Sequence, residues 1–309
     1  MWSLLQIFFV IISVVEFIMG TLGNGFIVLI NSTSWFKIRK ISVIDFILTW
    51  LAISRMCVLW TTVAGASLRK FHKTLSYSKN FKICFDIIWT GSNYLCIACT
   101  TCISVFYLFK IANFSNSIFF WIKQRIHVVL LAIVLGTIIY FILFLIFMKM
   151  IANNFIYKWT KLEQNTTFHV LDTLSGFLVY HSLYNGILIF FFIVSLTSFI
   201  LLIFSLWSHL NRMKLQGIHT KDTSTEAHIR AMKTMMSFLL FFIIYYISNT
   251  MLIVANSILD NVVAQIFSYN LIFLYLSVHP FLLVLWNSKL KWAFQCVLRK
   301  LVCHSGGYP

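Results

Sequence analysis

A single arginine stands inside a long apolar stretch, where a charge is expensive. Arg55 follows Asp45 closely enough that a helix would carry it about 15 Å deeper, into otherwise apolar surroundings. An arginine at mid-membrane depth costs several kcal/mol unless it is paired or hydrated, and by default it marks a functional position. Asn24 and the carboxylate of Glu16, both in the first apolar stretch, are candidate partners.

Two interpretations of Arg55 and Asn24 stay open. We expect a polar clasp between the first, second and seventh apolar stretches that rearranges when the protein switches conformation. The alternative is a static polar contact with no role in ligand binding. Both use the same hydrogen-bonding chemistry, because a buried guanidinium and an amide must find partners in lipid.

Aromatic and amide side chains recur at a spacing of four in two other stretches. Trp89 and Asn93 would lie on one face of a helix, as would Tyr245 and Asn249. At 1.5 Å per residue, Trp89 would lie about 10 Å and Asn93 about 16 Å below the outer surface. These depths allow the two pairs to face one another.

Two tyrosines complete the expected set. Tyr269 lies in the last apolar stretch and Tyr184 begins the fifth. The six residues would line an aromatic cavity with few hydrogen-bonding groups and no fixed charge, which suits small, mostly apolar organic molecules. The alternative is that the rings pack between helices or lie in the interfacial belts.

These side chains require helices that cross a membrane. The 309 residues are 60% hydrophobic and 10% charged, whereas soluble domains carry about 25% charged residues. A spanning helix needs about 20 apolar residues. Such segments cover residues 4–30, 44–66, 83–109, 126–148, 184–206, 232–256 and 263–287. They predict an all-α membrane protein, a single seven-transmembrane-helix bundle over residues 1–309 with a tail at 288–309.

Charge predicts how the bundle is oriented. With the N-terminus outside, the cytosolic loops and tail hold about 15 Lys and Arg and the extracellular loops about 8, which favours an N-out, C-in orientation. The basic first extracellular loop runs against this rule. The net charge of +16 is spread over short loops, so we expect the lipid bilayer as a partner and no nucleic acid.

The cysteines predict neither a loop disulfide nor a cofactor. Cys84 lies near the outer end of the third segment, and residues 149–183, the expected second extracellular loop, contain no cysteine. Cys96, Cys99 and Cys102 within that segment are expected to be small packing residues, although a metal site is conceivable. We expect no metal and no other cofactor.

Two modifications and one helix start are also predicted. Asn165 begins an Asn-x-Thr sequon in the second extracellular loop and is the glycosylation candidate. Cys296 and Cys303 follow the last span and are either palmitoylated or free thiols. Thr223 and Glu226 have capping-box spacing, which predicts that the sixth helix begins there and protrudes from the membrane.

Enzyme signatures do not occur in the sequence. There is no His-Glu-x-x-His, no phosphate-binding glycine loop and no Gly-x-Ser-x-Gly elbow. We therefore expect that the protein is not an enzyme. A transporter would often have related halves or interrupted helices, and a channel would need a filter or a ring of charge. Neither pattern stands out, and both classes are kept as alternatives.

Short motifs stand at the junctions of the apolar segments. They are Gly23–Ile27, Leu51–Arg55, Phe106–Tyr107, Lys110–Ser115, Leu201–His209, Thr225–His228, Ala231–Lys233, His279–Phe281 and Asn287–Lys291. These motifs resemble those of the bitter taste receptors (taste receptors type 2), a family of seven-helix G-protein-coupled receptors, and the resemblance runs almost from end to end. Like that family, the chain lacks the Asp-Arg-Tyr and Asn-Pro-x-x-Tyr motifs of rhodopsin-like receptors.

The resemblance implies a binding site and a signalling partner. It implies that Trp89, Asn93, Tyr245 and Tyr269 line an agonist pocket and that Asn165 is glycosylated. It also implies bitter agonists and a gustducin-type heterotrimeric G protein that acts through phospholipase C and calcium. Some family members carry a carboxylate near the position of Tyr269, so strongly cationic agonists are not expected here.

The resemblance also suggests how the signal would reach the G protein. Arg55, Tyr107, Lys110 and His209 are the candidates for the inner coupling network, in a multi-pass receptor of the plasma membrane. The alternative within receptors is a vomeronasal-type chemosensory receptor. The alternative from another class is a small-molecule transporter or channel.

Overall fold

The fold was determined as a computed structural model that describes residues 4–39, 42–71, 79–112, 114, 116–161, 166–215, 223–257 and 261–305. Regular elements in these ranges are all helices. They are α1 (Leu4–Ile38), α2 (Val43–Phe71), α4 (Lys79–Ile111), α5 (Ser117–Gln124), α6 (Ile126–Lys161), α7 (Thr166–Leu215), α8 (Thr223–Ser257), α9 (Val262–Trp286) and α10 (Ser288–Ser305). The sequon residue Asn165 lies outside the described residues.

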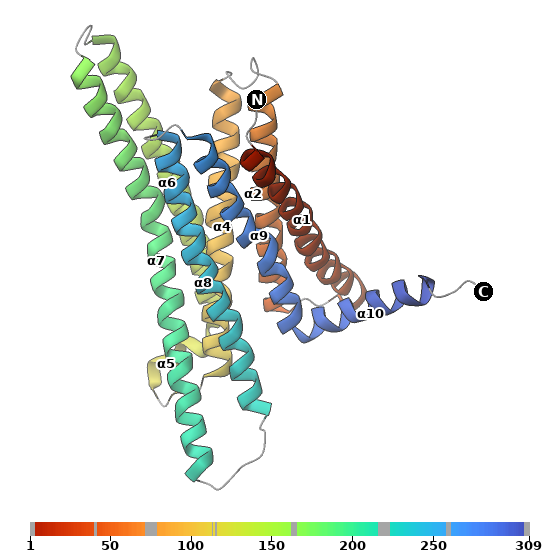
Figure 1. The fold of residues 1–309 in the computed structure, drawn as a ribbon. Coiled ribbons are helices and arrows are strands. Elements are labelled where there is room, and N and C mark those ends of the chain that lie inside the picture. The colour runs from red at the N-terminus through yellow and green to blue at the C-terminus, as the bar shows by residue number, and fades with distance from the viewer. Residues whose placement is uncertain are drawn as a thin grey trace.

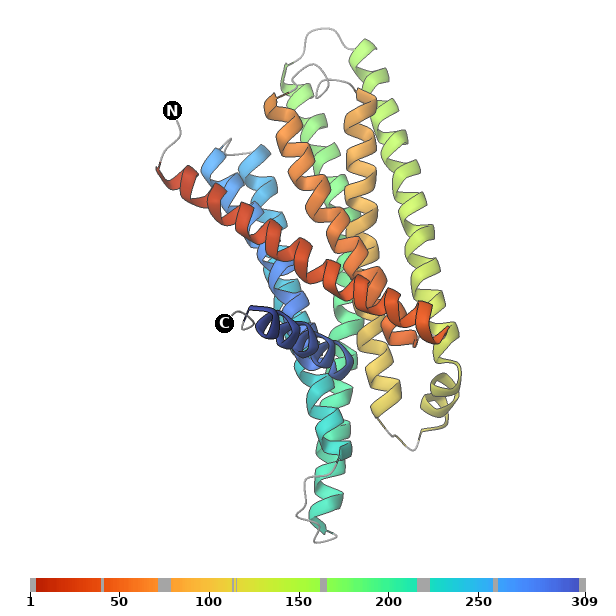
Figure 2. The same ribbon diagram turned by 90° about the vertical axis from the view of Figure 1, so that its right-hand side faces the viewer.

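Among the described residues, 7 helices are long and apolar enough to cross a membrane, namely α1, α2, α4, α6, α7, α8 and α9. They stand side by side as a bundle, and α10 runs from the end of α9 past the end of α1 and away from the other helices (Figures 1 and 2). This confirms the predicted all-α, seven-helix membrane fold. We refer to the end that carries α5 and α10 as the α10 end.

The helices continue beyond their apolar cores, because polar residues at their ends can hydrogen-bond in water and still keep helical backbone. Helix α8 begins at Thr223, where the capping-box spacing predicts a start. Residues 288–305, expected only as a tail, form α10. This helix buries Leu290 and Ala293 against the bundle and exposes Trp292.

Helix α4 lies at the centre of the bundle and positions the predicted site. It packs against α2, α6, α7 and α8. Its buried face combines small residues such as Ala98 with polar ones such as Thr100. Small and hydroxyl-bearing residues allow close helix contacts in lipid, where there is no hydrophobic force to hold helices together.

Two glycines allow α1 to approach α9 closely. A Cβ added at Gly20 would lie 2.7 Å from Leu59 Cδ1 and 3.3 Å from the Ser277 Cα. One at Gly23 would lie 3.2 Å from the Cβ of Pro280. The missing side chains therefore bring the neighbouring Asn24 within hydrogen-bonding distance of α9.

A polar contact joins α1, α2 and α10 at the α10 end. Lys289 Nζ lies 2.9 Å from Asp45 Oδ2 and donates to Asn31 Oδ1 at 3.2 Å. Asn31 in turn donates to the Asp45 backbone carbonyl at 3.2 Å. The first turn of α10 is thus fixed beneath the ends of α1 and α2.

Candidate functional site

Four of the six residues predicted to bind a ligand are linked across three helices by ring contacts and side-chain hydrogen bonds. Trp89 and Asn93 come from α4, Tyr184 from α7 and Tyr245 from α8; we call these four residues the aromatic cluster. The Tyr184 ring stacks on that of Trp89 with centroids 6.1 Å apart and an interplanar angle of 17°. It also stacks on Tyr94, with ring centroids 5.6 Å apart.

Hydrogen bonds hold the polar part of the aromatic cluster. The Tyr245 hydroxyl donates to Asn93 Oδ1 and lies 3.3 Å from the Tyr184 hydroxyl. Asn93 uses its amide donor within its own helix, on the Trp89 carbonyl at 2.7 Å. Its side-chain oxygen is therefore free to accept from α8. Asn93, Tyr184 and Tyr245 are each 2% exposed, so the side chains fill the space between the three helices.

The other two residues predicted to bind a ligand, Asn249 and Tyr269, lie outside the aromatic cluster. Asn249 is buried on α8 and donates to the Tyr245 carbonyl at 2.9 Å. Tyr269 on α9 is half-buried and packs against the same apolar core. Their role in ligand binding stays a prediction.

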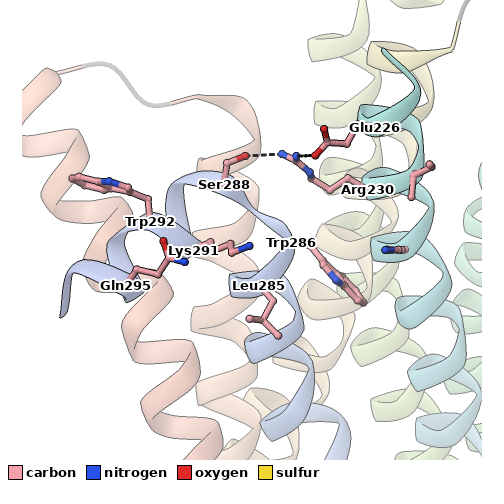
Figure 3. A pocket seen from close by; sticks show the side chains of 10 residues that line it. Glu226, Arg230, Leu285, Trp286, Ser288, Lys291, Trp292 and Gln295 are labelled. Carbon is pink, nitrogen blue, oxygen red and sulfur yellow. Dashed lines mark hydrogen bonds and ion pairs between the residues drawn. The ribbon is translucent and has the colours of Figure 1, made fainter. Parts of the chain in front are cut away.

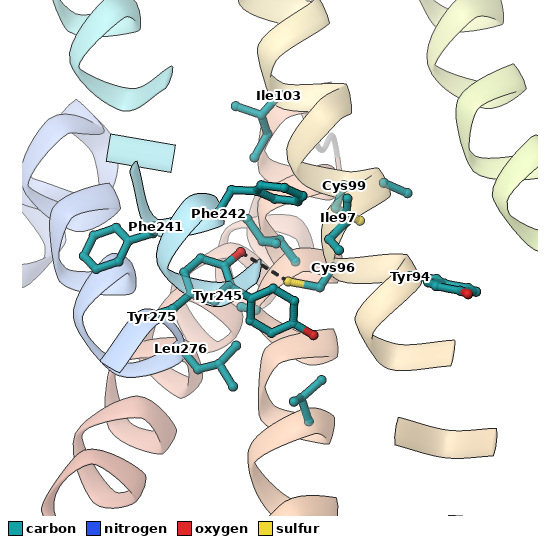
Figure 4. Packing of buried hydrophobic residues seen from close by; sticks show 14 of the residues in the cluster. Tyr94, Cys96, Ile97, Cys99, Ile103, Phe241, Phe242, Tyr245, Tyr275 and Leu276 are labelled. Carbon is teal, nitrogen blue, oxygen red and sulfur yellow. Dashed lines mark hydrogen bonds between the residues drawn. The ribbon is translucent and has the colours of Figure 1, made fainter. Parts of the chain in front are cut away.

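Arg55 is completely buried and finds its partner on α9. Its Nη2 donates to the Tyr275 hydroxyl at 3.1 Å, and its guanidinium carbon lies 4.9 Å from the centre of the Tyr275 ring. The Tyr275 hydroxyl also lies 3.5 Å from Cys96 Sγ, as Figure 4 shows. A ring face and a hydroxyl oxygen both attract a cation, so Tyr275 offsets part of the cost of burying Arg55.

Asn24 reaches the next residue of α9. Its amide donates to the Leu276 carbonyl at 3.0 Å and to the Gly20 carbonyl at 2.8 Å. The hydrogen bond expected between Asn24 and Arg55 is not formed, because Asn24 Oδ1 and Arg55 Nε and Nη1 have no hydrogen-bond partner among the described residues. Instead, Asn24 joins α1 to α9 and Arg55 joins α2 to α9, so that the two residues are linked only through α9.

Tyr275 connects the two sites, and the sequence reasoning missed it. Its ring lies 5.6 Å from that of Tyr245 and 6.0 Å from that of His279, which is 1% exposed. A continuous series of buried contacts therefore runs from Trp89 to Arg55 and His279. The sequence contains little indication of this role, because Tyr275 is one of several aromatic residues in an apolar segment. Its contact with Arg55 depends on how α2 and α9 are rotated about their axes.

The other three candidate coupling residues, Tyr107, Lys110 and His209, lie at the α10 end on α4 and α7. Tyr107 is half-buried between two apolar clusters. Lys110 is exposed, with its Nζ 5.2 Å from the centre of the Phe106 ring. His209 stacks on His228 of α8 with centroids 5.8 Å apart. His228 was missed as a contact, although it lies in one of the motifs quoted above.

Three cavities in the described part of the chain are lined by residues other than the aromatic cluster. One of about 740 Å³ lies between α2, α4 and α6, and one of about 540 Å³ lies between α1 and α2. The third, of about 420 Å³, lies between α8, α9 and α10. Only the third combines basic and apolar side chains.

The described residues form a multi-pass, seven-helix membrane protein with a series of polar groups buried inside the bundle. The taste receptor protein (TAS2R) family matches residues 1–302 of the sequence. The chain is 38% identical to taste receptor type 2 member 8 of Pongo pygmaeus over 299 residues, which cover 96% of this chain and 95% of the relative. It is 39% identical to taste receptor type 2 member 30 of Homo sapiens over 303 residues, or 97% and 92% of the two chains.

The chain therefore belongs to the type 2, or bitter, taste receptor family. This confirms the family that the junction motifs indicated. The family is one of receptors and not of enzymes, and the match extends over nearly the whole chain and nearly the whole of each relative.

Proposed function

We propose that this chain is a plasma-membrane receptor for small, largely apolar bitter compounds. The agonist binds at the aromatic cluster together with Asn249 and Tyr269. The N-terminus and Asn165 lie outside the cell, and the α10 end faces the cytosol. There the receptor activates a gustducin-type heterotrimeric G protein, which signals through phospholipase C and calcium.

The observation that carries the proposal is the buried series of contacts from Trp89 through Tyr245 and Tyr275 to Arg55. Because the Trp89 and Tyr184 rings are stacked and the Tyr184 and Tyr245 hydroxyls are in contact, an agonist that enters must separate or reorient these side chains. Tyr245 would then move against Tyr275, which holds Arg55. Binding is thereby linked to the contact that joins α2 to α9.

Binding activates the receptor only if the agonist prefers the active arrangement of helices, since equal affinity for both states shifts nothing. In the proposed change, α7 and α8 move at the α10 end, where His209 and His228 join them. Tyr107 and Lys110 on the stationary α4 would then face the G protein. Arg55 is the buried end of this coupling network.

Intracellular calcium tests the proposal. Cells would express the chain with a chimeric G protein that carries a gustducin tail, and receive a panel of bitter compounds. We expect a dose-dependent calcium signal that disappears without the chimera. A signal that persists without any G protein would instead indicate a transporter or channel. Silence toward the panel, with the receptor confirmed at the surface, would count against bitter compounds as its ligands.

A tryptophan pair tests where the agonist binds. Trp89→Ala removes a ring that stacks in the aromatic cluster, and we expect the agonist to need about tenfold higher concentration, which corresponds to ~1.4 kcal/mol. Trp60→Ala is the matched control, because Trp60 is on α2, is 53% exposed and contacts Phe17 instead. Equal loss in both variants, at equal surface expression, would move the binding site away from the aromatic cluster.

A further inference from the structure

The cavity of about 420 Å³ between α8, α9 and α10 is lined by charged residues, unlike the two larger cavities described above. Arg230 and Lys233 from α8 and Lys291 from α10 line it, and Glu226 is the one acidic residue among the described residues that line it. Figure 3 shows these helices around the cavity, with Arg230 between Glu226 and Ser288. The cavity therefore carries a net positive charge beside a membrane-spanning segment.

Apolar side chains border the same cavity on the side that faces lipid. Ile229 is 41% exposed and Leu285 is 52% exposed, and both line the cavity. On α8 the exposed side chains continue away from it at helical spacing through Met236, Leu240 and Ile243. Lys233 is exposed and lies in this lipid-facing stripe between Ile229 and Met236. The cavity thus opens where the apolar surface of the bundle meets basic groups.

The geometry points to a binding site for an anionic phospholipid. We propose that its phosphate-bearing headgroup occupies the cavity and contacts Lys233, Lys291 and Arg230. Its acyl chain runs along the exposed stripe of α8, which extends about 15 Å from Lys233 to Ile243 at 1.5 Å per residue. Basic cavities between transmembrane helices at the cytosolic surface accept such headgroups.

A lipid matches this surface better than a soluble anion or an acidic protein segment. A soluble anion would make no use of Ile229, Leu285 or the α8 stripe, which remain exposed in the described structure. An acidic protein segment would approach from the aqueous side, whereas Lys233 lies on the lipid-facing side of α8. Phosphoinositides carry several phosphate charges and so complement three basic groups best. Their presence in the cytosolic leaflet rests on the orientation in the proposed function.

The bound headgroup would act on a contact that crosses between helices. Arg230 Nη1 donates to Ser288 Oγ at 2.7 Å, and Nη2 lies 2.8 Å from Glu226 Oε1. A phosphate in the cavity competes with both oxygens for the guanidinium. The affinity for the lipid would therefore depend on the distance between α8 and α10.

Lipid binding to the purified full-length chain tests the site. The chain in detergent would be titrated with a fluorescent phosphatidylinositol bisphosphate and followed by anisotropy. We expect the double variant Lys233→Gln, Lys291→Gln to bind about 30-fold more weakly, since each lysine near the headgroup contributes about 1 kcal/mol and 1.4 kcal/mol is a factor of ten. The control Arg299→Gln, Lys300→Gln removes the same charge from exposed positions of α10 outside the cavity.

The controls decide between the cavity and simpler explanations. Equal weakening in both double variants would show attraction to the general charge of α10 and overturn the site. Full competition by soluble inositol trisphosphate at the affinity of the lipid would overturn the role of the acyl chain. Unchanged lipid affinity together with lost G-protein activation would assign the cavity to an acidic protein segment and not to lipid.

One variant should act in the opposite direction. Glu226→Gln removes the acidic lining residue, and we expect the lipid to bind about fivefold more tightly, because one like charge fewer is worth about 1 kcal/mol. Damage to the fold would weaken binding and could not produce this gain. Weaker or unchanged binding in Glu226→Gln would contradict the electrostatic basis of the site.

Discussion

The buried centre of the bundle and its α10 end are joined across the helices in different ways. At the centre, Arg55, Asn93 and Tyr245 are each at most 2% exposed, and their contacts pass through rings and hydroxyls. At the α10 end, Arg230 of α8 donates to Ser288 of α10 and also pairs with Glu226 of its own helix, and the side chains of Arg230 and Glu226 are 44% and 72% exposed. Exposed ion pairs contribute only about 0–1 kcal/mol.

This difference indicates which part of the bundle can open. Breaking a buried contact leaves a polar group without a hydrogen-bond partner in a medium without water. The buried polar side chains can therefore exchange one partner for another, but the helices cannot move apart there without a large cost. The groups at the α10 end can be solvated as soon as they part. A receptor built in this way transmits a rearrangement through its centre and opens at the end where the contacts are weakest.

The largest effect is expected from the centre. Tyr275→Phe removes the hydroxyl that accepts from Arg55 and leaves that guanidinium nitrogen without a partner. We expect the free energy of unfolding to fall by about 2 kcal/mol, the usual cost of an unsatisfied buried group next to a charge. Thermal unfolding in detergent would measure it. Tyr140→Phe is the control, since it removes a half-buried hydrogen bond between two uncharged groups, the Tyr140 hydroxyl and the Leu183 carbonyl. An equal loss of stability in Tyr140→Phe would show that the charge of Arg55 adds nothing to the effect.

A smaller loss is expected within the aromatic cluster. Tyr245→Phe keeps the ring but removes the hydroxyl shared with Asn93 and Tyr184. In the proposed complex this hydroxyl bonds to the agonist instead, and a hydrogen bond contributes about 1 kcal/mol, so we expect agonist potency in the calcium assay to fall about fivefold. The neighbouring half-buried Tyr246→Phe should leave potency unchanged. If Tyr246→Phe matched Tyr245→Phe, the aromatic cluster would not be the part that senses the agonist.

The contact of α10 with α1 and α2 is intermediate. Lys289 and Asp45 have side chains 35% and 13% exposed, between the centre and the Arg230 pair. Lys289→Gln should lower the free energy of unfolding by about 1 kcal/mol, while Lys291→Gln, exposed two residues later, should change it little. Thermal unfolding of the two variants distinguishes a specific contact from loss of charge. Identical unfolding free energies in the two variants would show that apolar contacts alone hold α10 against the bundle.

The smallest effect is expected where the bundle opens. Ser288→Ala removes the oxygen that accepts from Arg230 and leaves the guanidinium free to bind water. We expect agonist-independent calcium signalling to rise about twofold, as for a contact of about 0.5 kcal/mol, with little change in unfolding. Ser32→Ala serves as the control, because Ser32 of α1 is half-buried and lines the cavity between α1 and α2. A large drop in stability for Ser288→Ala would contradict the weak, separable contact inferred here.

The fold could be predicted from the sequence because lipid leaves few choices. A run of apolar residues long enough to span the membrane must be helical, and Arg55, although buried, did not interrupt its segment. Helix α10 was harder to predict, because its charged residues conceal the buried face that includes Leu290. Its register becomes clear only once the bundle provides a surface for that face.

The candidate site could be predicted only in part. A spacing of four places Trp89 and Asn93 on one face of α4, and this required no knowledge of other helices. The partner of Arg55 depends on how α2, α9 and α1 are rotated and how deep each lies. The sequence therefore favoured Asn24, while the structure places the Tyr275 hydroxyl 3.1 Å from Arg55.

The most direct measurement compares distances at the two ends of the bundle. Spin labels would replace Ile229 on α8 and Trp292 on α10, with a second pair at Met251 on α8 and Val262 on α9; all four positions are exposed. The accessible native Cys84 would be changed to serine. With an agonist identified by the calcium assay, pulsed electron resonance would record both distances.

We predict that agonist lengthens the distance from 229 to 292 by several ångströms and leaves the distance from 251 to 262 nearly unchanged. That result would locate opening at the weakly joined α10 end. An unchanged distance from 229 to 292, or a larger change between 251 and 262, in a receptor that still signals would contradict the account.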